Sequence, residues 1–233
     1  YSQQNYNVYD QIGQQDYFAA QGTGGNDGLF NQLINTPAHI LLSKYKNYKT
    51  DKFSTYENWF TNYGLNPYFS LGNWRKNGKK QDLISNIELG LKPADWLDFT
   101  YRASINSRNI AERYITEGVK TSQWGENRGK TSITPALEEY NYNQTILTSE
   151  LFGSVNKQIN DDLKFSGILG TFVSQNEYRK TSVGAGNLVI PELQNIGIRV
   201  GNLTGESNGY KTRLFSVYGS AGFNYKNWAN VEF

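Results

Sequence analysis

Residues 83–106 read LISNIELGLKPADWLDFTYRASIN, and apolar and polar side chains alternate along this stretch. Leu89 and Leu91 are separated by Gly90, and after a Lys-Pro-Ala-Asp turn the same alternation resumes at Phe99 and Tyr101. Period-two alternation over about ten residues is typical of a β-strand with one apolar face, and a short turn rich in Pro and Asp joins strands into hairpins. The stretch therefore predicts an antiparallel hairpin.

The same hairpin pattern recurs twice further along the chain, over residues 145–174 and 211–233. The turn residues Asp95, Asp162 and Asn227 lie 67 and 65 residues apart. Long polar segments, residues 107–144 and 175–210, separate the three hairpins, and we expect them to be loops. Short turns alternating with long loops are typical of bacterial outer-membrane barrels, in which the turns are periplasmic and the loops extracellular. A soluble β-sandwich would show the same alternation and remains an alternative.

Composition excludes several other classes. The 233 residues are 37% hydrophobic and 15% aromatic, with a mean hydropathy of −0.65 and a net charge of +2. The absence of Cys excludes disulfides and thiol chemistry, and a single His makes a His-rich metal site untenable. A near-neutral chain without basic clusters argues against nucleic-acid binding. A transmembrane β-barrel fits this low hydropathy, since its strands are apolar on one face only.

We therefore expect an all-β fold, an antiparallel transmembrane β-barrel in which residues 1–233 form part of a single domain. Residues 1–20 would be a strand end and the start of a loop, residues 21–80 one long extracellular loop, and residues 83–106, 145–174 and 211–233 hairpins. Because the sequence lacks Met even at position 1, we also expect a piece of a longer chain.

The alternation also predicts an orientation for the strands. The residues expected to face lipid are Leu89, Leu91, Leu97, Phe99, Tyr101, Leu151, Phe165, Leu169, Phe215, Val217 and Phe223. Those expected to face an aqueous lumen are Asn86, Glu88, Arg102, Glu150, Lys164 and Arg213.

No constellation predicts catalysis. The adjacent pair Asp161-Asp162 would point to opposite faces of a strand, and Gly22–Gly25 lacks the Lys of a phosphate loop. His39 follows Pro37 in a loop, where a structural role is expected. We predict no enzyme activity, no catalytic residue, no metal site and no cofactor.

Aromatic residues are dense between residues 58 and 74, in the long loop. Trp and Tyr side chains stack on sugars and dominate binding hot spots. The candidates for ligand or partner contact are Trp59, Tyr63, Tyr68, Phe69 and Trp74. A loop that packs on itself is the alternative.

Three motifs in order, TPAHI at 36–40, NPYF at 66–69 and PADWL at 93–97, resemble the central barrel of the SusC/RagA family. These are TonB-dependent outer-membrane transporters of the Bacteroidetes, and the resemblance spans about residues 28–233. Position 69 is Phe where the family often has Trp. The resemblance implies a fragment of a 22-stranded, plugged barrel, with the plug and the TonB-contacting segment outside this sequence.

The resemblance further implies TonB-dependent import of an oligosaccharide or peptide, with a SusD-like lipoprotein as the lid that captures the cargo. The aromatic candidates would then contact cargo or lid, and the barrel would be embedded in outer-membrane lipid. A non-transport barrel or surface protein and a soluble β-sandwich binding module remain alternatives.

Overall fold

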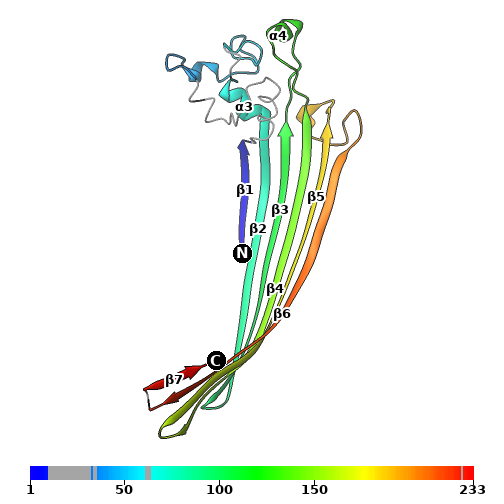
Figure 1. The fold of residues 1–233 in the computed structure, drawn as a ribbon. Helices are drawn as coiled ribbons and strands as arrows, with labels where there is room; N and C mark the ends of the chain where they lie inside the picture. The colour runs from blue at the N-terminus through cyan, green and yellow to red at the C-terminus, as the bar shows by residue number, and fades with distance from the viewer. Residues whose placement is uncertain (10–32, 34–35, 61–63, 227) are drawn as a thin grey trace.

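The computed structural model describes residues 1–9, 33, 36–60, 64–226 and 228–233. Figure 1 shows one long curved sheet with packed loops at one end, the loop end, and short turns at the other, the turn end. The elements are β1 (Ser2–Tyr9), η1 (Leu42–Tyr45), α3 (Pro67–Asn73), β2 (Trp74–Ala94), β3 (Leu97–Thr116), α4 (Gln123–Asn127), β4 (Ala136–Asn160), β5 (Leu163–Gly186), η2 (Pro191–Leu193), β6 (Thr204–Tyr225) and β7 (Ala229–Glu232).

The seven strands lie in the order β1-β2-β3-β4-β5-β6-β7, and all neighbours are antiparallel. The all-β antiparallel prediction is confirmed. Among the described residues the sheet is not closed, because β1 and β7 lie at its two edges. No helix in this part of the chain is long and apolar enough to cross a membrane.

The strands are longer than the alternation predicts. β3 extends to Thr116, and β4 begins at Ala136. β5 extends to Gly186, and β6 begins at Thr204. The predicted bounds of the loops 107–144 and 175–210 are therefore wrong, because strands occupy both ends of each range. The predicted bound of the loop 21–80 is also wrong at its C-terminal end, because β2 begins at Trp74. The physical reason is that both faces of these added strand segments are polar, so they carry no apolar alternation.

The register divides the side chains of the sheet between two faces. Leu89, Tyr101, Leu151, Thr171 and Val217 lie opposite one another in a row across five strands, on what we call the first face. Their sequence neighbours Glu88, Arg102, Glu150, Phe172 and Ser216 form the adjacent row on the opposite side, the second face.

Apolar residues dominate the first face over about nine residues of each long strand, and we call this the apolar band. It covers the first-face residues of 83–91, 97–105, 147–155, 165–173 and 215–225. Nothing in the described chain covers the band: Leu89 is 62% exposed, Leu169 68% and Phe215 67%. The band therefore has the height that a membrane-spanning strand requires, about 9–11 residues.

The predicted orientation of Arg213 is wrong. All the residues expected to face lipid do lie on the first face, and Asn86, Glu88, Arg102, Glu150 and Lys164 lie on the second. Arg213, however, is two residues from Phe215 and shares its face, opposite Gln175, whose Oε1 accepts a hydrogen bond from Arg213 Nε at 2.9 Å. Arg213 lies at the border of the apolar band nearer the loop end, where the first face becomes polar.

Candidate functional site

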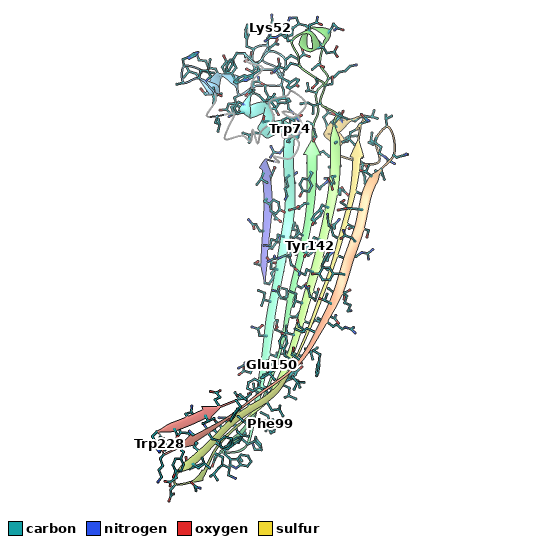
Figure 2. The ribbon with its side chains drawn as sticks, viewed as in Figure 1. Lys52, Trp74, Phe99, Tyr142, Glu150 and Trp228 are labelled. Carbon is teal, nitrogen blue, oxygen red and sulfur yellow. The ribbon has the colours of Figure 1, made fainter. Side chains whose placement is uncertain are left out.

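Polar and aromatic side chains gather at three places: a charged cluster near the turn end, a tyrosine-rich surface midway along the sheet, and the packed loops. Figure 2 marks them in order with Glu150, Tyr142 and Trp74. Among the described residues no group of three or more His, Asp or Glu side chains is placed to hold a metal ion.

The charged cluster lies on the second face, behind the apolar band. Arg102 Nε donates to Glu88 Oε2 at 2.7 Å, and its guanidinium also lies 3.6 Å from Glu150. The Tyr218 hydroxyl donates to the other Glu150 oxygen at 2.8 Å. The Tyr218 ring crosses Gly170 to reach Glu150, since a Cβ on Gly170 would lie 2.5 Å from that ring. The charged cluster and the exposed side chains of the apolar band therefore lie on opposite faces of the same part of the sheet.

A second tyrosine fixes β1 to the sheet in the same way. The Tyr6 ring crosses Gly78 of β2, and its hydroxyl donates to Glu112 of β3. Glu112 also accepts from the Tyr114 hydroxyl at 2.8 Å and pairs with Lys76 at 2.9 Å. Burial and the bond to Glu112 raise the pKa of Tyr6 to about 12. Burial alone would raise the pKa of Glu112, but its three hydrogen-bond donors outweigh burial and hold that pKa below the ordinary value of 4.5.

Replacing Glu112 by Gln should loosen β1. Because the folded-state pKa of Glu112 is depressed, its stabilisation is complete above about pH 4.5 and is lost as the pH falls through the folded-state value. Loss of a hydrogen-bonded charge should cost about 1–3 kcal/mol. Hydrogen exchange of the β1 amides at pH 7 should rise in Glu112→Gln, and the difference from the unsubstituted protein should shrink toward pH 3. Glu139→Gln, whose more exposed carboxylate pairs with Arg113 at 3.3 Å, is the control and should change little. An equal effect of both substitutions would contradict the role of Glu112.

The loop end carries a core of its own. Tyr56, Leu65, Phe69 and Trp74 are buried together, with Tyr48, Val119 and Ile133 packed against them. The Phe69 ring lies 5.0 Å from Tyr56 and 5.8 Å from Trp74. Asn66 starts α3 by accepting a hydrogen bond from Tyr68 N, with Pro67 next to it in the first turn. The Asn66 amide also donates to the carbonyls of Tyr45 and Ser54, so one side chain joins three segments of the loop.

The β3–β4 loop, which contains α4, is fixed to the same core. The Tyr56 hydroxyl donates to the Thr131 carbonyl at 2.9 Å, and Glu57 accepts from the backbone and side chain of Ser122. Lys130 is 2% exposed with its amine 5.5 Å from the Tyr56 ring, and burial, together with the charge of Arg128, lowers its pKa to about 8. The loops therefore form one assembly, which we call the loop assembly.

Asn73, the last residue of α3 before β2, connects the loop assembly to the sheet through two hydrogen bonds. Its Oδ1 accepts from Gly118 N, and its carbonyl accepts from Glu117 N, both at 2.9 Å. Gly118 has a φ of +78°, and a Cβ there would lie 2.6 Å from Pro135 N, so this turn requires glycine. A cavity of about 500 Å³ opens beside this connection, lined by the Lys49–Glu117 ion pair together with Tyr48, Asn58 and Glu192.

The aromatic candidates predicted from sequence lie mostly inside this assembly. Trp59, Phe69 and Trp74 are 1%, 4% and 2% exposed, and Tyr68 is half-buried. Tyr63 lies outside the described residues. Contact with cargo or lid stays a prediction for these residues, but their burial favours the alternative in which the loop packs on itself.

The tyrosine-rich surface was missed by the sequence analysis. Tyr140, Tyr142, Tyr178 and Tyr210 lie on the second face, and we call them the tyrosine surface. Tyr142 and Tyr178 stack with centroids 5.7 Å apart, and Tyr178 meets Tyr210 edge-on at 4.3 Å. All four lie in the stretches predicted to be loops, although the spacing of Tyr140 and Tyr142 was a strand signal.

Fold and site together define a seven-stranded antiparallel sheet that carries an apolar band on one face and a charged cluster on the other. The sequence matches no protein-family model, and no curated protein matches it. Among solved structures, the chain is similar to the RagAB peptide transporter, with a TM-score of 0.60 at 11% identity. It is also similar to the RagAB peptide importer in the open-open state (TM-score 0.64, 11% identity) and in the closed-closed state (TM-score 0.54, 12% identity).

Each match covers 72% of this chain and 18% of the other, so the chain spans about a fifth of the length of the structures it matches. At such low identity the likeness shows the fold alone.

Proposed function

We propose that this chain is part of an outer-membrane β-barrel transporter that imports large nutrients, oligosaccharides or peptides, in a TonB-dependent manner together with a SusD-like lid lipoprotein. The observation that carries this proposal is the apolar band of the first face lying directly behind the charged cluster of the second. Lipid on one side and water on the other would suit both faces.

The geometry of the band favours a barrel over a β-sandwich. A sandwich buries its apolar face under a second sheet, whereas within the described residues no second sheet covers the band. Lipid cannot hydrogen-bond the free edges that β1 and β7 present, so further strands would have to close the sheet. The turn-end aromatics Trp96, Tyr225 and Trp228 would lie at the membrane interface, where such rings are enriched.

Two observations support transport with a lid. The motifs at 36–40, 66–69 and 93–97 resemble those of the SusC/RagA family, and the sheet shares its fold with part of the RagAB peptide transporter. The loop assembly would then lie outside the cell, where a lid lipoprotein docks, and the second face would line the cargo path.

Deleting the gene that encodes the full protein should abolish uptake of its cargo. We expect cells without it to lose accumulation of either fluorescent oligosaccharides or fluorescent peptides, and a plasmid copy to restore it. An affinity-tagged copy should retain a lipoprotein through detergent extraction. A plasmid copy with the TonB-contacting segment removed is the control: it should reach the outer membrane in normal amount but restore no uptake. Unchanged uptake of both cargo classes in the deletion strain would contradict the proposal.

A further inference from the structure

A groove of about 440 Å³ lies on the second face at the loop end of the sheet, a size typical of small-ligand sites. Tyr114 and Tyr140 line it together with small residues, among them Gly184, Gly186 and Thr204. A Cβ on Gly186 would meet nothing within 4 Å, so the space above this residue is open. The groove is thus a shallow site flanked by two phenol rings.

The tyrosine surface continues from this groove along the second face. Tyr140 belongs to both, Tyr142 follows two residues further along β4, and Tyr178 and Tyr210 lie opposite each other on β5 and β6. Tyr210 is 46% exposed, and the other three rings are half-buried. From Tyr114 to Tyr178 the series spans four side-chain rows of the second face, a distance of about 20 Å. Amides lie beside it: Gln144 Nε2 donates to Asn176 Oδ1 at 3.1 Å.

The charges near this series are mostly paired with each other. Lys180 pairs with Glu206, Arg108 with Asp82 at 2.7 Å, and Lys76 with Glu112. Glu138 is an exposed carboxylate in the groove that can accept hydrogen bonds from hydroxyl groups. Partly exposed phenol rings, amides and paired charges suit a ligand with flat apolar faces and many hydroxyls but no net charge.

We propose that the groove and the tyrosine surface form a binding track for a neutral glycan chain, with one sugar ring in the groove and further rings stacked on Tyr142, Tyr178 and Tyr210. This inference rests on the proposed transport function and selects the oligosaccharide class of cargo. Amphipathic aromatic rings provide large contact area with a polar tip, which a pyranose ring matches on its apolar face and its hydroxyls.

The test is calorimetric titration of the full protein in detergent with maltoheptaose, cellohexaose, mannohexaose and xylohexaose, and with a mixture of heptapeptides. We expect at least one oligosaccharide to bind, and Tyr140→Ala and Tyr178→Ala each to raise its Kd about tenfold or more, as for anchor residues of binding sites. Gly186→Val, whose Cβ would lie in open space, should abolish binding in a folded protein. Asn141→Ala, on β4 between two tyrosines but facing the other way, should leave the Kd unchanged.

Failure of all four oligosaccharides to bind would overturn the proposal, as would a Kd that Tyr140→Ala and Gly186→Val leave unchanged. Peptide binding that Tyr140→Ala weakens would also overturn it, in favour of a peptide track. These outcomes are distinct from failure of the proposed function, because gene deletion and uptake measure transport whatever binds to this surface. A protein that restores peptide uptake but binds no glycan would refute the track alone.

Discussion

Leu151→Arg should prevent stable insertion of the full protein into the outer membrane. Leu151 lies at the middle of the apolar band on the central strand β4, between Tyr101 and Thr171, and is 50% exposed on the first face. An Arg at the bilayer midplane of a β-barrel costs about 2–4 kcal/mol, because the guanidinium loses its water without gaining a partner. Urea unfolding in lipid vesicles would measure the loss, and the amount of heat-modifiable protein in outer membranes would report assembly.

Ser154→Arg is the matched control. Ser154 lies three residues away on the same strand but on the second face, opposite Asp98, where a new cation would have water and a carboxylate nearby. We expect its unfolding free energy to stay within about 1 kcal/mol of the unsubstituted protein. If both substitutions were equally harmless, the apolar band would not face lipid, and the proposed membrane location would fail with it.

Trp74→Ala should unfold the loop assembly while leaving the sheet intact. Trp74 is 2% exposed, starts β2 and packs edge-on against Phe69 inside the core of the loop assembly. Replacing a buried Trp by Ala costs about 3–5 kcal/mol, since contacts are lost and a cavity remains. Hydrogen exchange at the amides of Ser54 and Ser70 should accelerate, whereas exchange at mid-sheet amides such as Thr148 should not change.

Trp124→Ala provides the comparison, because Trp124 is 48% exposed on α4, with the Arg128 guanidinium over its ring at 4.6 Å. It should leave exchange in the loop core unchanged. If Trp74→Ala instead left exchange unchanged and weakened cargo or lid binding, the aromatic residues would form an interface rather than a core.

Sequence reasoning located the parts of the sheet where one face is apolar. Between Leu83 and Leu91 apolar and polar side chains alternate, and this alternation predicts the strand, its end at the turn and the face of each side chain. The register confirmed these faces except at Arg213. Arg213 is two residues from Phe215 in one strand and therefore shares its face, although a charged side chain was expected on the face opposite to the apolar one.

The loop-end half of the strands could not be found in that way, because polar residues occupy both faces there. Tyr140 to Gln144 reads as a loop by hydropathy, yet its tyrosines recur with period two. The burial of Trp59 and Phe69 depends on contacts between segments far apart in the chain, such as the bond from Asn66 to Tyr45. Aromatic density alone cannot distinguish a core from a binding surface.

The length of the strands sets a distance between the membrane and the loops. With the apolar band in lipid, the part of β4 from Ala136 to Ile146 extends about 35 Å further on the loop side. Hydrogen bonds to β3 and β5 continue along this whole segment, so it is a rigid spacer (Figure 1). A protein that docks on the loop assembly would therefore sit clear of the lipid headgroups, and its affinity would not depend on the lipid composition of the membrane.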